Sequence, residues 1–334
     1  MNSLPGVAIL GCGLIGQKRA KALTNAKLVV CVDVDEKRAR ALAAGFPDCD
    51  FTSDWRAAVC RADVEIVIIS TTNDALVETS LAAVQAGKHV LVEKPAARNV
   101  AELDVLIEAV SARDGVQVRV GFNHRYHPAL LKARELFDAG ELGELMFIRG
   151  RYGHGGRKGY DREWRANPAL SGGGELIDQG VHLIDLSGWF LGDFSEIDGF
   201  AHTYFWDMPV DDNGFIILKT PKKQTAFLHV SCTEWKNLFS FEIYGRNAKL
   251  HVEGLGGSYG VEKLSFYKML PEMGPPDTTI WEYPRGENSW ALEFSEFLKD
   301  IELKRTPSAN LLDARAALVA VEKIYKDSGY DYYT

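Results

Sequence analysis

The sequence predicts an N-terminal α/β domain with a parallel sheet, followed by a domain built on an antiparallel sheet. Three observations lead to this prediction. The chain has 334 residues, more than one ordinary hydrophobic core organises. In the first third, continuous apolar runs alternate with helical patterns, which is typical of a parallel sheet covered on both faces. Later runs alternate apolar and polar residues with period two. We therefore predict two domains, at residues 1–122 and 123–334.

Composition and charge argue against several classes of partner. The chain is 46% hydrophobic and 25% charged, and its net charge of −8 argues against nucleic acid. The start "MNSLPG" leads directly into the apolar "VAIL", which leaves no room for a signal peptide, and no apolar run reaches the ~18 residues of a membrane helix. Five scattered cysteines without a CxxC pair suggest reduced thiols. We expect a cytoplasmic protein with no nucleic-acid or membrane partner.

The segment "GVAILGCGLIGQKRAKAL" predicts a strand, a glycine turn and a helix. Gly11, Gly13 and Gly16 match GxGxxG, in which the glycines permit a tight turn, close approach of a pyrophosphate, and close packing of helix on strand. The diphosphate would lie at the helix N-terminus, against the N–H groups of Leu14, Ile15 and Gly16. This predicts a dinucleotide-binding loop.

Asp33 ends the second predicted strand, 22 residues after Gly11, where a ribose-binding carboxylate is expected. A carboxylate there accepts hydrogen bonds from a ribose 2′-hydroxyl and repels a 2′-phosphate, so NAD should be preferred. Lys37 and Arg38 are close enough to soften this preference, and NADP remains possible. The structural alternative is that Asp33 caps the helix "EKRARALAAGF".

Two further strand ends carry polar residues, "STTND" at 70–74 and "EKP" at 93–95. Ligands of parallel sheets bind beyond the carboxyl ends of the strands. A lysine on the short turn before a proline can direct its cation at a nicotinamide or a substrate oxygen, although a loop ion pair is an equally simple interpretation. We expect cofactor contacts from these residues: Ser70, Thr71, Asn73, Glu93 and Lys94.

The pattern changes after "VQVRVGFNHRYHPALLKARELFDAG". A helix is predicted from His127 to Ala139, followed by seven strand-like runs and two closing helices at 289–303 and 311–329. Several of the runs, such as "FIILKT" and "FSFEIY", carry apolar residues on both faces. We therefore predict a homodimer or homotetramer formed through this sheet. Alternatively, the closing helices cover the second face within one chain.

The ordered motifs GxGxxG, "STTND", "EKP", "GFNHRYHP" and "SGGGELIDQGVHLIDL" resemble those of the Gfo/Idh/MocA family. This is the glucose–fructose oxidoreductase, inositol dehydrogenase and rhizopine-catabolism group of NAD(P)-dependent oxidoreductases, and the resemblance extends over essentially the whole chain. It implies a Rossmann domain followed by a domain with a large, mostly antiparallel open sheet. It also implies a cofactor contact at Asn123 and a substrate that is a sugar, a polyol or a sugar nucleotide. Arg19 and Val77 stand where histidine is common in the family.

The resemblance also implies catalytic roles for Lys94, Asp178 and His182. The chemistry agrees, because His182 can exchange the hydroxyl proton near neutral pH while Lys94 polarises the same oxygen. Asp178 and Asp185 lie one turn before and one turn after His182 on a predicted helix, where Asp178 could orient the imidazole or bind a sugar hydroxyl. The alternatives are a metal site, which three ligands from one helix make implausible, and a satisfied core histidine. We predict no metal.

The segment 151–165 is rich in arginine, tyrosine, histidine and tryptophan, which together suit hydroxyl groups and sugar rings. Trp164 and Arg165 are the leading substrate contacts, and a loop of solvated arginines is the structural alternative. The predicted substrate-binding set is Lys94, Arg151, Trp164, Arg165, Asp178 and His182.

We predict an oxidoreductase that transfers a hydride between the nicotinamide and a secondary alcohol or ketone of a sugar, polyol or sugar nucleotide. A dehydrogenase or reductase of a bile pigment or dihydrodiol, and a non-catalytic NAD-binding redox sensor, are the alternatives. The residues leave open the exact substrate and the roles of Asp185 and the other arginines of 151–165.

Overall fold

The computed structural model describes residues 4–284, 286 and 288–332, and the chain divides into two compact units. The first unit contains Met1–Phe122 and Trp290–Arg315, and the second contains Asn123–Ser289 and Ala316–Thr334. The predicted single boundary after residue 122 therefore needs a correction. Residues 290–315 belong to the first unit, and Phe294 and Phe297 of this stretch are part of its apolar core.

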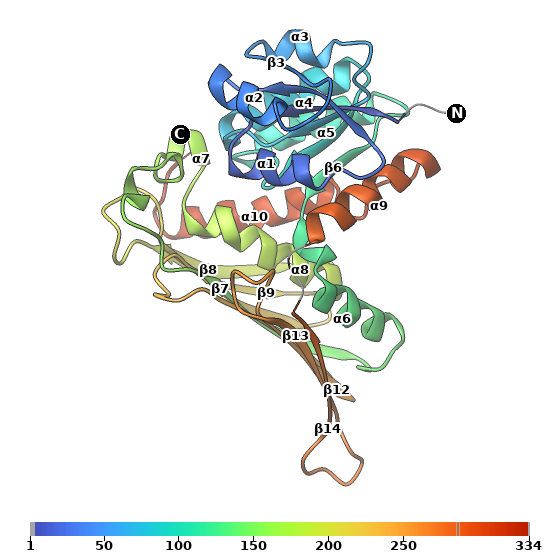
Figure 1. Ribbon diagram of the computed structural model, residues 1–334. Helices are drawn as coiled ribbons and strands as arrows, with labels where there is room; N and C mark the ends of the chain where they lie inside the picture. Colours follow the sequence, from blue (N-terminus) through green and yellow to red (C-terminus); the bar gives the residue numbers. More distant parts are fainter. Residues whose placement is uncertain (1–3, 285, 287, 333–334) are drawn as a thin grey trace. The chain divides into compact units, whose positions relative to one another are not determined.

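The first unit is built on a six-stranded sheet with the strand order β3-β2-β1-β4-β5-β6, in which every pair is parallel (Figure 1). Its central strands are apolar throughout and buried throughout, as expected for a sheet covered on both faces. The strands are β1 (Gly6–Leu10), β2 (Lys27–Val32), β3 (Asp50–Thr52), β4 (Ile66–Ile69), β5 (His89–Glu93) and β6 (Val118–Gly121).

Helices connect these strands. Asp35, Asp54 and Asn99 cap three of the helices by accepting backbone N–H groups of the first turn. The connecting helices are α1 (Leu14–Lys21), α2 (Glu36–Ala43), α3 (Trp55–Val59), α4 (Asn73–Gln85) and α5 (Val100–Ser111), and α9 (Ser289–Leu303) is added from a later part of the sequence.

Helix α9 is fastened to the first unit by its core and by buried ion pairs. Phe294 and Phe297 belong to the same apolar cluster as the side chains of β1 and β4. Arg19 of α1 contacts Glu293 at 2.5 Å, and Arg119 of β6 contacts Asp300, with all four side chains at most 1% exposed. A buried ion must be paired to be tolerated, so these pairs fix where α9 packs.

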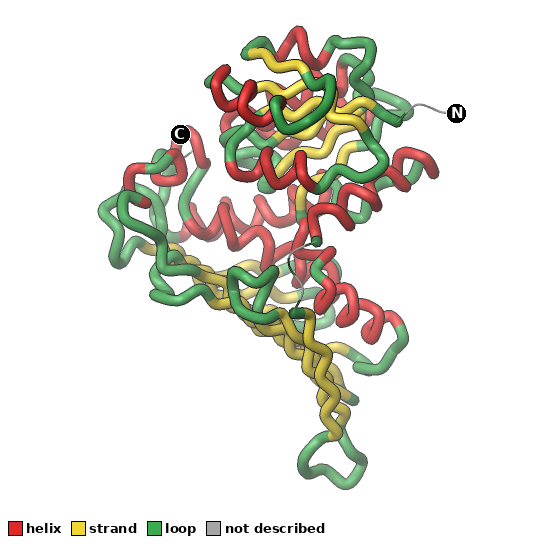
Figure 2. The backbone as a smooth tube through the Cα atoms, in the orientation of Figure 1, coloured by secondary structure: helices red, strands yellow, loops and turns green. Residues whose placement is uncertain are grey.

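The second unit is built on an eight-stranded sheet with the order β14-β13-β12-β11-β7-β10-β9-β8. Figure 2 shows its strands in yellow. All of its neighbours are antiparallel except β7 and β10, which run parallel. The strands are β7 (Leu145–Gly153), β8 (Glu196–His202), β9 (Asn213–Lys219), β10 (Thr225–Ser231), β11 (Leu238–Gly245), β12 (Ala248–Glu253), β13 (Glu262–Lys268) and β14 (Asp277–Tyr283).

Helices α6 and α8 lie on the same face of this sheet (Figure 1). Gly150 of β7 leaves room for Leu183 of α8, so the helix packs closely on the strand. The helical segments of this unit are η1 (Asn123–Tyr126), α6 (Pro128–Asp138), η2 (Tyr160–Arg162), η3 (Trp164–Ala166), α7 (Pro168–Ser171), the π-helical turn η4 (Leu176–Gly180), α8 (Val181–Leu191) and α10 (Leu311–Asp327), whose first turn lies in the first unit.

The opposite face of the sheet carries both apolar and charged side chains. Phe200 of β8 and Phe227 of β10 are 50% and 51% exposed there. Farther along the sheet, Glu242 of β11 pairs with Arg149 at 2.8 Å and with Lys249 at 2.5 Å. This face is therefore apolar at one end and polar in the middle. Within the described part of the chain, no helix combines the length and apolar character needed to cross a membrane.

Candidate active site

The glycine loop of the first unit is shaped as an open cradle. Gly11 has φ +91° and approaches Ser70 so closely that a Cβ would lie 2.4 Å from the Ser70 carbonyl oxygen. A Cβ on Gly16 would lie 1.9 Å from the Gly11 oxygen, whereas one on Gly13 would meet nothing within 4 Å. Gly13 also begins α1 without a side-chain cap, and Leu14 beside it is 71% exposed. The loop thus leaves space and backbone N–H groups for a diphosphate.

Asp33 closes one side of this cradle. Its carboxylate accepts the N–H of Cys12 at 2.8 Å and the N–H of Asp35 at 2.9 Å. The residue that caps α2 is Asp35, which accepts the N–H of Lys37. The structural alternative for Asp33 is therefore not what the structure shows. A carboxylate held beside the glycine loop fits a ribose diol.

Glu93, a predicted cofactor contact, belongs to a buried ion cluster. It accepts Arg19 Nε at 2.6 Å, and Arg19 also contacts Glu293 and lies 4.4 Å from the ring centroid of Trp290. Burial is the main cause of a raised pKa at Glu293. Arg19, for which the sequence suggested no role, thus holds the end of β5 immediately before Lys94. The peptide between Lys94 and Pro95 is cis.

The described neighbours of the other predicted cofactor contacts differ in kind. The Ser70 hydroxyl donates to the Gly11 carbonyl oxygen at 2.8 Å and so stabilises the glycine loop. Asn73 is buried in the first turn of α4, where Thr72 is the N-cap residue. Asn123, in the second unit, donates to Ser289 Oγ at 2.8 Å. Thr71 is half-buried and its hydroxyl donates to the Thr72 carbonyl at 3.1 Å.

In the second unit, His182 lies within a cluster of aromatic rings. The imidazole of His124 stacks on it with centroids 3.7 Å apart and planes 21° apart. Tyr152 of β7 contacts both rings edge-on, at 5.2 Å from His124 and 6.3 Å from His182. His124 was not predicted as a site residue. Its signal was the position directly after Asn123 in "GFNHRYHP", a motif that sequence reasoning used only for Asn123.

Asp185 explains how this stack is held. Its carboxylate accepts Arg125 Nε at 2.9 Å and Nη2 at 2.6 Å, a bidentate pair in which both side chains are at most 5% exposed. Arg125 follows His124 in η1, and Asp185 lies three residues after His182 in α8. The pair therefore fixes η1 against α8, and with it one imidazole against the other.

Asp178 lies on the π-helical turn that precedes α8 rather than on one continuous α-helix. The predicted regular spacing of Asp178, His182 and Asp185 is thus wrong in its first step. Asp178 Oδ2 accepts Arg165 Nε at 2.9 Å, and the Arg165 guanidinium lies 4.6 Å from the Trp164 ring. The charge of Asp178 is the main cause of a raised pKa at Arg165.

Arg151, another predicted substrate contact, is not brought to this cluster. It is exposed on β7, and its neighbour Tyr152 is buried on the side of His182. Successive strand residues point to opposite faces, so Arg151 lies on the other face of the sheet. Arg157 pairs with Glu163 at 2.6 Å. Of the predicted substrate-binding residues in this unit, Trp164, Arg165 and Asp178 contact one another, and His182 lies in the helix that follows Asp178.

Further polar groups surround this cluster and were not predicted. Glu175, fully buried just before the π turn, lies 3.8 Å from His154 Nε2. Burial lowers the pKa of His154 and raises that of Tyr160, whose ring contacts it at 5.4 Å. Among residues 4–284, 286 and 288–332, no three His, Cys, Asp or Glu side chains are placed to hold a metal ion.

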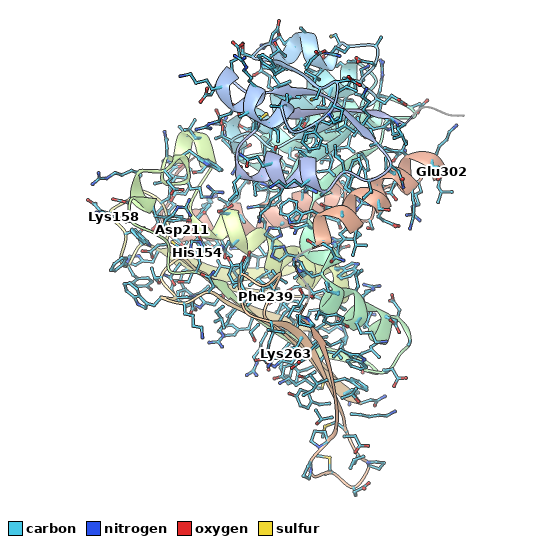
Figure 3. All side chains as sticks on the ribbon, viewed as in Figure 1. His154, Lys158, Asp211, Phe239, Lys263 and Glu302 are labelled. Carbon is cyan, nitrogen blue, oxygen red and sulfur yellow. The ribbon has the colours of Figure 1, made fainter. Side chains whose placement is uncertain are left out.

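A cavity of about 790 Å³ opens beside the cluster. Phe239 and Tyr259 line it, and both rings contact Tyr152, at 5.4 and 5.1 Å. Lys263 also lines it and is labelled with Phe239 in Figure 3. The lining therefore combines aromatic and charged side chains.

Comparison with known proteins identifies the class to which this fold and these motifs belong. Residues 6–122 match the family described as an oxidoreductase family with an NAD-binding Rossmann fold, and residues 130–251 match the GFO/IDH/MocA C-terminal domain. The chain belongs to the Gfo/Idh/MocA family of oxidoreductases, and its first unit carries the family's NAD-binding domain.

Named relatives are sugar and polyol dehydrogenases. The chain is 28% identical over 227 residues to levoglucosan dehydrogenase of Pseudarthrobacter phenanthrenivorans, covering 64% of this chain and 58% of that protein. It is 30% identical over 201 residues to inositol 2-dehydrogenase 2 of Saccharopolyspora erythraea, covering 59% and 56%. The matched stretches thus span less than two thirds of either relative.

Solved structures share the whole fold. Levoglucosan dehydrogenase in complex with NADH and levoglucosan superposes with a TM-score of 0.85 at 23% identity, covering 97% of both chains. GenD2 from gentamicin A biosynthesis, in complex with NAD, gives a TM-score of 0.83 at 24% identity, covering 98% of this chain and 95% of that one. The predicted two-part fold is confirmed.

Proposed function

We propose that this protein is an NAD-dependent dehydrogenase of a neutral sugar or polyol, with Lys94, Asp178 and His182 as its catalytic residues. The single observation that carries the proposal is the stack of the buried His182 on His124, because an imidazole held among other rings can exchange a hydroxyl proton near neutral pH. When bound, the nicotinamide would accept the hydride from the carbinol carbon.

The first unit fits the dinucleotide. Gly13 leaves an open position at the start of α1, and the N–H groups of Leu14 and Ile15 would hold the diphosphate. Asp33 would accept the ribose hydroxyls and exclude a 2′-phosphate, which favours NAD over NADP. Lys94 would polarise the substrate oxygen while His182 takes its proton.

The charges near His182 favour a neutral substrate over an acidic one. Glu175 and Asp178 contribute two carboxylates, and Arg165 is paired with Asp178. Burial raises the pKa of Tyr152, and the charges of Asp178 and Glu175 add to this effect. An uronic acid or sugar nucleotide would meet this negative field, whereas hydroxyl groups can bond to both the carboxylates and Arg165. The names of the relatives agree with this choice.

Initial rates of NADH formation test the proposal. Inositols and neutral aldoses should be oxidised faster than uronic acids or nucleotide sugars. His182→Ala and Lys94→Ala should each lose about 10²–10⁴-fold in rate while still binding NAD. His202→Ala, which removes an exposed imidazole of β8, serves as the matched control. Normal turnover by His182→Ala would return this residue to a structural role, and NAD binding without any turnover would favour a redox sensor.

We further propose a homo-oligomer formed through the open face of the eight-stranded sheet. Phe200 and Phe227 are half exposed there, and a second copy would cover them. Light scattering should give a multiple of 37.0 kDa. Phe227→Lys should shift the mass toward that of one chain, and a wild-type mass of 37.0 kDa would contradict the proposal.

All five cysteines are free thiols, which fits the expected cytoplasmic location.

A further inference from the structure

The start of the helical segment formed by η4 and α8, which carry Asp178 and His182, is held by two side chains from distant parts of the sequence. Asp211 lies just before β9, and Tyr325 lies on α10. Both side chains are fully buried. Tyr325 donates its hydroxyl to Asp211 Oδ1 at 2.6 Å, so the two act as one hydrogen-bonded pair. Figure 3 labels Asp211.

This pair and the Asp211 backbone accept four consecutive N–H groups. Gly174 N–H donates to Asp211 Oδ1 at 2.9 Å, and Leu176 N–H donates to Oδ2 at 2.8 Å. The Asp211 carbonyl accepts Glu175 N–H at 3.0 Å. The Tyr325 hydroxyl accepts Ile177 N–H at 3.3 Å and also lies 3.0 Å from Gly174 N.

The first N–H groups of a helix have no partner within the helix, and a local side chain usually caps them. Here Glu175, the residue at the start of the π turn, makes no side-chain cap hydrogen bond. The four N–H groups are accepted instead by Asp211 and Tyr325. The negative charge of a carboxylate also suits this end of the helix.

The glycines of "SGGGEL" are required by the same contact. A Cβ on Gly173 would lie 2.3 Å from the Tyr325 hydroxyl oxygen, and one on Gly174 would lie 2.0 Å from the Asp211 carbonyl oxygen. Any larger residue would push the pair away from the backbone that it holds. The glycines thus let two distant side chains reach the helix start.

We propose that Asp211 and Tyr325 are positioning residues, which set the direction of the π turn and of α8 and thereby place Asp178 and His182 for catalysis. The inference rests on the proposed function of His182. Asp178 N–H bonds back to the Gly174 carbonyl at 3.1 Å, so a shift of Gly174 moves Asp178 directly. Misplacement of a reacting group by about 1 Å can cost 10²-fold in rate.

Tyr325→Phe tests this inference, because it removes the hydroxyl and keeps the ring. We expect kcat to fall ~10-fold or more, with the Kd for NAD within twofold of wild type, since the glycine loop belongs to the other unit. Tyr330→Phe is the matched control: its hydroxyl contacts Thr203 at 2.9 Å, and its ring, which contacts that of Tyr325, is kept. It should keep the wild-type kcat. If Tyr325→Phe cannot be purified, Asp211→Asn is measured against the same criterion.

The outcomes separate this inference from the proposed function. The positioning role is supported if Tyr325→Phe has a low kcat with unchanged NAD affinity and the separate variant His182→Ala is inactive. A lowered melting temperature with kcat within twofold of wild type overturns it, because the pair would then be only structural. Full activity of His182→Ala overturns the proposed function itself and the inference with it.

Discussion

Asp300→Ala is expected to destabilise the first unit strongly, because it leaves a buried guanidinium without its carboxylate. Arg119 is fully buried and Asp300 is 1% exposed. Arg305 Nε also contacts Asp300, at 2.6 Å, so this one carboxylate serves two cations. Breaking a buried pair by removing one partner typically costs about 3–5 kcal/mol. For a unit of about 150 residues, this corresponds to a loss of about 6–20 °C in melting temperature.

Thermal denaturation followed by circular dichroism would measure this loss. Asp104→Ala is the matched control, because Asp104 also pairs with an arginine but both side chains are 41% exposed. Solvent-exposed pairs contribute little, so the control should melt near wild type. The double variant Arg119→Met, Asp300→Leu removes both charges and should recover most of the loss. Equal melting temperatures for Asp300→Ala and Asp104→Ala, or a double variant less stable than Asp300→Ala, would refute the reasoning.

Three further predictions concern pH, cofactor choice and the glycine loop. Burial lowers the pKa of His89, whose Nδ1 accepts Gln117 N–H at 3.1 Å. As the pH falls below about 6.5, His89 therefore takes up a proton in the unfolded chain before it does so in the folded protein. The free energy of unfolding should decrease with acidification for this reason. The urea midpoint should depend less on pH in His89→Gln, and an unchanged slope would contradict this. Asp33→Ala should bring the Kd values for NAD and NADP closer together; a retained preference would show that another residue selects the cofactor. Gly13→Ala should keep the wild-type melting temperature, since its Cβ would meet no protein atom within 4 Å. It should weaken NAD binding, because the Cβ would occupy the space that the diphosphate needs. Unchanged NAD affinity would show that the diphosphate binds elsewhere.

Local patterns predicted the first unit well. The glycine turn and the strands around it are encoded in short consecutive stretches, and the apolar runs of buried parallel strands are easily distinguished. Asp33 follows its strand directly, so its position beside the loop could be derived from spacing alone. The antiparallel sheet of the second unit was likewise predicted from period-two alternation.

Contacts between distant segments could not be derived in this way. Tyr325 lies 151 residues from Gly174, and nothing in the local sequence indicates that they meet. Asp211 lies 37 residues from Gly174, and its contact with the start of the π turn is equally absent from the local sequence. Arg151 is different, because the alternation along "LMFIRGRYGH" already placed it opposite Tyr152. Arg151 was predicted as a substrate contact from the residue types in 151–165, whereas the two-residue period of the strand places it on the opposite face.

The return of residues 290–315 to the first unit has a consequence for recombination between relatives. A chimera that exchanged only residues 1–122 would receive a foreign α9, and Arg19 and Arg119 would keep their partners only if that helix carried acids at the places of Glu293 and Asp300. The nucleotide-binding unit is therefore not encoded by one continuous stretch of sequence. Two stretches of sequence, separated by 167 residues of the other unit (Asn123–Ser289), must be inherited together.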